Sequence, residues 1–225
     1  HALAANDISL LVTAKSDLCV IDQSLRIVNQ TSLQNIEVKD LCWSKLLTRF
    51  LLITSEKVYS FDERTWCVEP CPTTLAHHHR WERGTCADAI LFLSTFGENP
   101  FIAEYNISPS IYLNKRWQAS NFCEDGEIVN DLKSNENSLG IIINNDYVNQ
   151  SRLELRSTKS FQRICSIDLG TGWNYRCSPF IDPYWSVVDA YNRRFLRVSN
   201  NGSIDTIECP ETKPLNVLYW TKNLM

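Results

Sequence analysis

The stretch Leu218–Leu224 (LYWTKNL) resembles Leu41–Leu47 (LCWSKLL), which lies far earlier in the chain. The earlier copy is followed by the apolar run Phe50–Thr54. The later copy has no such run after it, but a matching one lies at the other end of the chain, at Ser9–Thr13. We therefore predict that the two ends of the chain complete one repeat unit, as they do in a ring of repeats closed by its own termini.

Short apolar runs that end in a polar residue recur along the whole chain. Such runs are typical of strands that are buried on both faces of a sheet. Their polar ends lie 40 to 50 residues apart, a spacing that suits the four-stranded blades of a propeller. The runs are Leu10–Thr13, Leu51–Thr54, Leu91–Ser94, Ile141–Asn144 and Val187–Asp189.

A second, alternating pattern follows each run and predicts a strand that lies further from the core. One face of these strands is apolar or aromatic, with the pairs Cys19/Ile21, Tyr59/Phe61, Ala103/Tyr105, Leu153/Leu155 and Leu196/Val198. The other face is mixed, with Val20, Ser60, Glu104, Glu154 and Arg197. The two patterns together predict an all-β fold, a five-bladed β-propeller that spans residues 1–225 as a single domain.

The predicted blades follow the repeat. They are residues 216–225 with 1–32, then 36–73, 80–120, 126–168 and 174–212. In the first of these, the inner strand comes from residues near 216–222, so the N- and C-terminal segments pair within one blade. Such pairing would remove an open sheet edge and lock the ring.

The composition of the chain excludes several classes of function. Of its 225 residues, 44% are hydrophobic and 21% are charged, as in ordinary globular proteins. A net charge of -4 argues against a surface that neutralises phosphates, so we expect no nucleic-acid partner. No apolar stretch approaches the roughly 18 to 20 residues of a membrane-spanning helix, so we expect a soluble protein without a membrane partner.

The cysteines and the glycosylation sequons point to different compartments. Nine cysteines cannot all pair within one chain, and several, such as Cys19, lie in apolar strand patterns. We interpret them as buried thiols in a reducing compartment and predict a cytoplasmic protein. Four Asn-x-Ser/Thr triplets, which begin at Asn29, Asn106, Asn149 and Asn201, leave a secreted protein as the alternative.

The blade length and the strand pattern resemble those of WD-type and NHL-type β-propellers over essentially the whole chain. Tyr219–Lys222 (YWTK) also resembles the Tyr-Trp-Thr-Asp motif of receptor propellers, although Lys222 replaces the acidic residue and the other blades lack the motif. No Trp-Asp dipeptide and no kelch-type glycine pair is present. The resemblance implies a scaffold that binds proteins or peptides.

Three aspartates occupy comparable places near the starts of predicted inner strands, namely Asp40, Asp131 and Asp182. Inner strands surround the channel of a propeller, so these carboxylates are candidates for ligand binding at one of its mouths. Five-bladed glycoside hydrolases carry a catalytic pair of carboxylates there, about 5 to 10 Å apart. The alternative is that they are solvated polar residues at strand ends.

Other constellations are incomplete. The cluster His77–His79 offers two alternate imidazoles, for which Glu82 or Cys86 could supply a third ligand, but a polar linker between blades is favoured. Cys67 and Cys71 have no second pair, so we expect no metal and no cofactor. The acidic segment Glu124–Glu127 (EDGE) is either a solvated loop or a docking surface for a basic peptide. Three tryptophans near blade connections are candidates for an exposed binding rim, namely Trp81, Trp173 and Trp185.

A non-catalytic interaction module that binds a protein or peptide on the face or rim of the propeller accounts best for these features. We expect it to be a monomer and not an enzyme. A carbohydrate-binding, lectin-like propeller is the alternative, and a glycoside hydrolase that uses Asp40, Asp131 and Asp182 is the third hypothesis. Lectin propellers repeat one site in every blade, whereas here the segments between blades differ in length and content.

Overall fold

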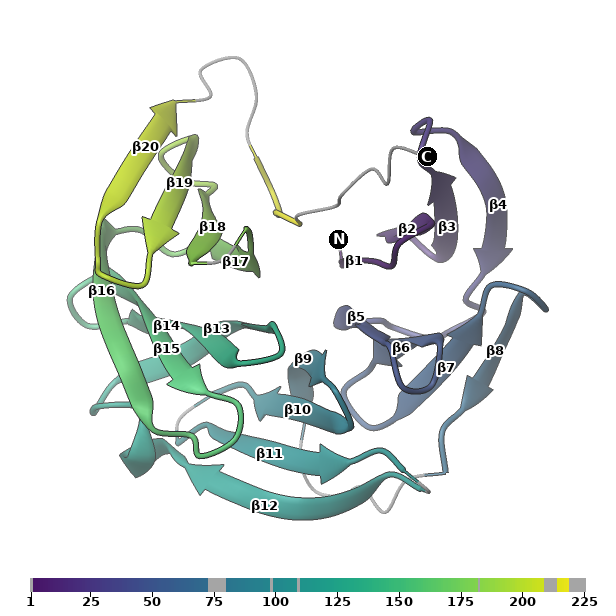
Figure 1. Ribbon diagram of the computed structural model, residues 1–225, viewed down its shortest axis with the longest axis horizontal. Coiled ribbons are helices and arrows are strands. Elements are labelled where there is room, and N and C mark those ends of the chain that lie inside the picture. Colours follow the sequence, from purple (N-terminus) through teal and green to yellow (C-terminus); the bar gives the residue numbers. More distant parts are fainter. Residues whose placement is uncertain are drawn as a thin grey trace. The chain divides into compact units, whose positions relative to one another are not determined.

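A computed structural model of the protein describes residues 2–72, 80–97, 99–108, 110–181, 183–208 and 214–218. These residues form five four-stranded antiparallel sheets, the blades of a five-bladed β-propeller fold (Figure 1). The prediction of an all-β, five-bladed fold is confirmed. The described residues contain one 3-10 turn, Ala119–Asn121, and no helix long and apolar enough to cross a membrane.

Each blade is formed by strands that are consecutive in the chain and adjacent in the sheet. The first blade contains β1 (Leu3–Ala5), β2 (Ser9–Ala14), β3 (Asp17–Asp22) and β4 (Ile27–Ser32). The second contains β5 (Asp40–Ser44), β6 (Arg49–Ile53), β7 (Val58–Asp62) and β8 (Cys67–Pro70). The third contains β9 (Trp81–Ala87), β10 (Ile90–Thr95), β11 (Phe101–Asn106) and β12 (Tyr112–Gln118). The fourth contains β13 (Glu127–Ser134), β14 (Ser138–Asn145), β15 (Gln150–Ser157) and β16 (Arg163–Thr171). The fifth contains β17 (Tyr175–Pro179), β18 (Tyr184–Asp189), β19 (Arg194–Ser199) and β20 (Ile204–Glu208).

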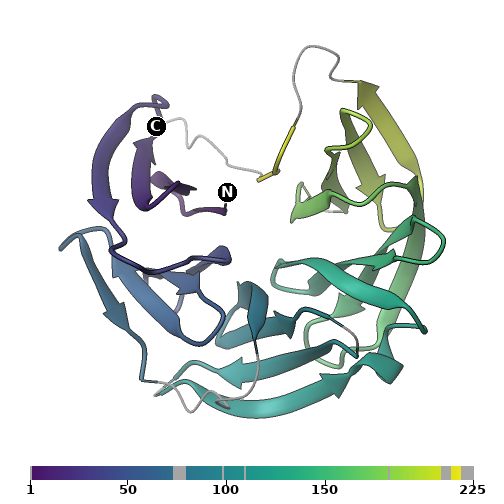
Figure 2. The ribbon, with the colours of Figure 1, turned by 180° about the vertical axis from the view of Figure 1, so that it is seen from behind.

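The first blade takes its inner strand from the N-terminal segment, which corrects the prediction of residues 216–222. Strand β1 pairs antiparallel with β2, with Leu3 opposite Val12, and Figure 2 shows the same purple strands from behind. Ala2 extends the pairing, because its N–H donates to the Thr13 hydroxyl at 2.8 Å. Residues 214–218 form no strand, and residues 219–225 lie outside the described part of the chain.

The chain divides into two compact units, each with its own packed core. The first includes residues 2–93 and 103–115, and the second includes residues 94–102 and 116–218. In the first unit, apolar side chains of the first blade, such as Leu11, pack with Phe50 and Phe61 of the second blade. In the second unit, Leu153 of the fourth blade packs with Trp185 of the fifth. Each core thus joins neighbouring blades face to face.

Candidate functional site

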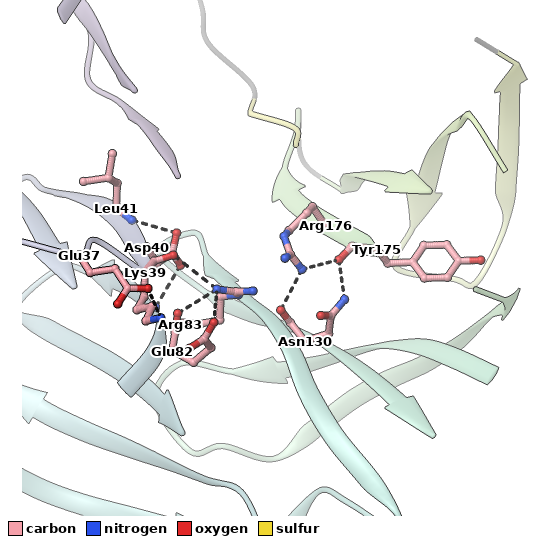
Figure 3. A network of polar contacts seen from close by, with 10 residues as sticks. Glu37, Lys39, Asp40, Leu41, Glu82, Arg83, Asn130, Tyr175 and Arg176 are labelled. Carbon is pink, nitrogen blue, oxygen red and sulfur yellow. Dashed lines mark hydrogen bonds and ion pairs between the residues drawn. The ribbon is translucent and has the colours of Figure 1, made fainter. Parts of the chain in front are cut away.

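The carboxylate of Asp40 joins the inner strands of two neighbouring blades in the first unit. Asp40 begins β5, and its Oδ2 accepts a hydrogen bond from the backbone N–H of Gly84 in β9 at 3.1 Å. Arg83, which precedes Gly84, donates from Nη1 to the carbonyl oxygen of Lys39, which precedes Asp40, at 3.4 Å (Figure 3). The two strands therefore contact each other through one carboxylate and one guanidinium.

Asp131 makes the equivalent contacts in the second unit. Its Oδ2 accepts a hydrogen bond from the backbone N–H of Cys177 in β17 at 2.8 Å. Arg176 donates from Nη1 to the carbonyl oxygens of Asn130 at 3.0 Å and of Tyr175 at 3.1 Å (Figure 3). We call this arrangement the carboxylate clasp. In it, an aspartate of one inner strand accepts a hydrogen bond from the backbone of the next inner strand, and an arginine of that next strand donates to the carbonyl oxygen of the residue before the aspartate.

The clasp gives two of the predicted ligand-binding aspartates a role within the fold. Asp40 and Asp131 are both buried, and each directs a carboxylate oxygen at backbone N–H of the adjacent blade. A carboxylate that accepts such a bond satisfies a buried donor that water cannot reach. Asp182 lies outside the described residues. Ligand binding by these three aspartates stays a prediction.

The predicted exposure of the three tryptophans is confirmed for one and wrong for two. Trp173 is 40% exposed, whereas Trp81 and Trp185 are buried. The Trp185 ring lies against Gly140 of β14, so closely that a β-carbon on residue 140 would come within 2.4 Å of it. Trp81 packs edge to face on Tyr105, with ring centroids 6.0 Å apart. Both buried indoles fill the space between strands and are out of reach of a partner.

The described residues hold no cluster of three side chains suited to a metal ion. The predicted histidine cluster, residues 77–79, lies outside that part of the chain.

The acidic segment Glu124–Glu127 lines two hollows in the second unit, with volumes of about 470 and 340 Å³. Glu124 and Glu127 line both hollows, and we call the two hollows together the acidic groove. Its total volume is in the range of pockets that hold ligands. Asp125, Asp146 and Tyr147 line the larger hollow, and Asp168 the smaller.

Two loops of the fourth blade hold the walls of the acidic groove in place. The backbone N–H of Asp146 donates to the carbonyl oxygen of Gly126 at 3.2 Å. The Tyr147 ring lies over Gly126, where a β-carbon would come within 2.2 Å of the ring. The side-chain oxygen of Asn145 accepts a hydrogen bond from the backbone N–H of Tyr147 at 3.0 Å. The turn that carries Tyr147 is thus fixed to the acidic segment, although 78% of this residue is exposed.

The charge of the groove is strongly negative. Its lining contains five carboxylates, on Glu124, Asp125, Glu127, Asp146 and Asp168, and one guanidinium. That guanidinium, on Arg152, is already engaged, because it pairs with Glu127 and donates to the carbonyl oxygen of Phe122 at 2.9 Å. No ion pair involving Glu124, Asp125 or Asp146 occurs within the described ranges. The groove therefore presents unneutralised carboxylates beside an exposed aromatic ring.

The thiol of Cys123, which also lines the larger hollow, is kept in its neutral form. Burial raises the pKa of Cys123 to about 12. A thiol with such a pKa is a poor nucleophile at neutral pH, because only the thiolate reacts. The groove contains carboxylates, an aromatic ring and a neutral thiol, which suits recognition of a positively charged group.

The acidic segment was predicted from the sequence as a candidate docking surface, whereas Tyr147 and its neighbour Val148 were not predicted. Both are exposed, and they lie in the hairpin turn between β14 and β15. The signal was present, because turns of this chain are mostly polar and these two residues place an aromatic and a branched apolar side chain directly after Asn144–Asp146. An apolar pair at a hairpin tip has no core to pack into, so the exposure of both side chains could be predicted from the sequence.

No protein-family model and no curated protein matches the sequence. Solved structures match nearly all of it at low identity. The nidogen/laminin complex aligns with a TM-score of 0.73 and 11% identity, over 98% of this chain and 84% of that one. The Neurospora crassa Pan2 WD40 domain aligns with a TM-score of 0.63 and 10% identity, over 95% of this chain and 66% of that one. A streptogramin B lyase aligns with a TM-score of 0.64 and 13% identity, over 97% and 72%. These similarities confirm the resemblance to WD-like and NHL-like propellers as a resemblance of fold.

Proposed function

We propose that this propeller is a protein-interaction module that binds a basic segment of a partner protein in the acidic groove. The observation that carries the proposal is the fixed, exposed Tyr147 ring beside unneutralised carboxylates. The propeller fold fits this role, since the solved structures similar to it include a WD40 domain and the nidogen/laminin complex.

A lysine or arginine side chain has the chemistry that the groove would recognise. Its charged end would pair with Glu124, Asp125 or Asp146, and its apolar stem would lie along the Tyr147 ring. Because these carboxylates pair with no cation in the part of the chain that the structure describes, the partner would break no ion pair there on entry. The smaller hollow, with Asp168, offers a second place for a basic side chain further along the same segment.

We propose binding rather than catalysis because three buried carboxylates already bind other groups of the fold and are therefore poorly placed to act as acid and base. Asp40 and Asp131 are occupied in the carboxylate clasp, and Glu127 is paired with Arg152. The similar folds do include enzymes, among them two lyases. Hydrolysis of one of the arrayed glycans used below would indicate catalysis instead of binding.

Fluorescence anisotropy with labelled peptides tests the proposal on the purified full chain. One peptide of about twelve residues carries several Lys and Arg, a second carries Glu at the same positions, and arrayed glycans serve as a third probe. We expect only the basic peptide to bind, and its affinity to fall as the salt concentration rises, because salt screens exposed charges.

Matched variants locate the binding site. Tyr147→Ala should weaken binding of the basic peptide by about tenfold or more, since exposed aromatic anchors carry a large share of binding energy. Tyr191→Ala is the control, because Tyr191 is a similarly exposed tyrosine, at 69%, in a turn of another blade. The double variant Glu124→Gln and Asp125→Asn should weaken binding and flatten its salt dependence. Equal binding by the acidic peptide, binding of glycans alone, or loss on Tyr191→Ala as large as on Tyr147→Ala would overturn the proposal.

A further inference from the structure

Two cysteine side chains from neighbouring inner strands meet in the first unit. Cys42 lies in β5 of the second blade and Cys86 in β9 of the third, and their Sγ atoms are 3.5 Å apart. This separation is close to contact between two sulfur atoms. A disulfide requires about 2.05 Å, so the two sulfurs need to approach by only about 1.5 Å.

The carboxylate clasp explains why the two thiols face each other. Asp40 and Gly84 are hydrogen-bonded, and Cys42 and Cys86 follow two residues later in their respective strands. Side chains alternate along a strand, so residues two apart lie on the same side. The contact between the thiols is therefore set by the register of the blades and does not depend on a loop.

The clasp itself does not require cysteines at this position. In the equivalent clasp of the fourth and fifth blades, the residues two positions beyond Asp131 and Cys177 are Lys133 and Pro179. The same backbone arrangement therefore forms without a pair of thiols. The pair at Cys42 and Cys86 is an addition to the repeat, which suggests chemistry of its own.

We propose that Cys42 and Cys86 form a reversible disulfide that links the second and third blades, with a small-molecule disulfide such as oxidised glutathione as the oxidant. Cys42 is 6% exposed and Cys86 is the more accessible of the two, so Cys86 reacts first. Its thiolate attacks one sulfur of the oxidant, which forms a mixed disulfide and releases one small thiol. The thiolate of Cys42 then attacks the Cys86 sulfur and releases the second small thiol. Two protein thiols lose two electrons and two protons, and the oxidant is reduced to two thiols.

A third cysteine near this pair is a poor competitor. Burial raises the pKa of Cys71 to about 11, with Cys86 among its electrostatic neighbours. Cys71 and Cys42 are both shielded from solvent, so the distance between sulfur atoms, and not thiol acidity, decides which of them reaches Cys86. The short distance between the Cys42 and Cys86 sulfurs thus selects the pair that joins the blades.

Incubation of the folded full chain in mixtures of reduced and oxidised glutathione, followed by peptide mapping, tests this inference. We expect the oxidised protein to lose two thiols, to become lighter by about 2 Da and to yield one crosslinked peptide pair that contains Cys42 and Cys86. Its thermal midpoint should rise by several degrees, because the crosslink constrains the unfolded chain. Addition of a reducing dithiol should reverse both changes.

Single variants separate the linkage from nonspecific oxidation. In Cys42→Ser, glutathione should stay attached to Cys86 and no crosslinked peptide should form. In the control Cys67→Ser, which replaces an exposed cysteine, the crosslink between Cys42 and Cys86 should form as in the wild-type chain. Absence of any crosslink in the wild-type chain at high oxidised glutathione would overturn the inference. Pairing of Cys86 with Cys71, or persistence of the crosslink signal in Cys42→Ser, would also overturn it.

Discussion

Replacement of Asp131 by alanine should lower the free energy of unfolding by about 2 to 3 kcal/mol. Asp131 is 1% exposed, and its Oδ2 accepts a hydrogen bond from the backbone N–H of Cys177 at 2.8 Å. Cys177 is also fully buried. A hydrogen bond to a charged group contributes about 1.5 to 3 kcal/mol, and removal of the acceptor leaves a buried N–H without a partner. For a chain of this size, each kcal/mol moves the thermal midpoint by about 2 to 4 °C, so the midpoint should fall by about 4 to 12 °C.

Urea unfolding followed by circular dichroism measures the effect, with two variants as references. Asp131→Asn keeps an oxygen in the acceptor position and should lower the free energy of unfolding by about half as much as Asp131→Ala. Asp205→Ala removes an exposed carboxylate that pairs with Arg197, and it should cost less than about 1 kcal/mol. The slope of the transition should stay unchanged in all three variants, because the folded state keeps its extent of burial.

Unfolding of Asp131→Ala at the wild-type urea concentration would contradict a stabilising role of this carboxylate. A wild-type midpoint together with loss of binding or turnover would assign the carboxylate to a ligand and not to the clasp. Asp40→Ala is an independent repeat of the experiment, since Asp40 makes the same bond to Gly84 in the other unit. The two alanine variants should agree within about 1 kcal/mol, a margin typical of context effects on one kind of interaction.

Three further substitutions test other contacts of the second unit. Gly140→Ala should lower stability by about 1 to 3 kcal/mol, because the new β-carbon would lie 2.4 Å from the Trp185 ring, and an unchanged urea midpoint would contradict this. Glu154→Gln should cost about 3 to 5 kcal/mol in the same assay, since Glu154 is fully buried among three arginines, and a loss under 1 kcal/mol would refute a structural role. Burial raises the pKa of Asp189, but hydrogen bonds from Asn192 and an arginine outweigh this and hold it below its usual value. Its contribution to stability is therefore present above about pH 4 and is lost as the pH falls through the lowered pKa, so Asp189→Asn should flatten the acid side of the stability profile measured by thermal unfolding at each pH.

The repeat could be predicted from the sequence because its strongest signals are long apolar runs in the middle of each blade. Those runs became β2, β6, β10, β14 and β18, one in each of the five sheets. The inner strand of the first blade could not be predicted in the same way. Leu3–Ala5 is short and consists mostly of small side chains, so it carries no recognisable alternation. Its place in the sheet comes from pairing with β2, a contact that periodicity does not report.

The burial of Trp185 shows why side-chain exposure was harder to predict than strands. A tryptophan near a blade connection is exposed unless a neighbouring strand leaves room for the ring, and Gly140 leaves that room. The glycine lies in another blade, so nothing adjacent to Trp185 in the sequence indicates the gap. Trp173 lies in the turn before β17, and its side chain stays 40% exposed while its carbonyl oxygen accepts hydrogen bonds from Asn130 and Asn144.

Repetition itself separates the structural residues of this chain from its functional candidates. A residue type that recurs at one position of several blades meets a need that every blade has, such as contact with the next inner strand. Asp40 and Asp131 recur in this way, and both are bound in clasps. A feature that one blade has and the equivalent blade lacks is not required by the repeat. The thiols of Cys42 and Cys86 are of this second kind, and they lie where the clasp already holds the two inner strands together. In a repeat protein without informative relatives, departures from the repeat are therefore better guides to function than its best-repeated polar residues.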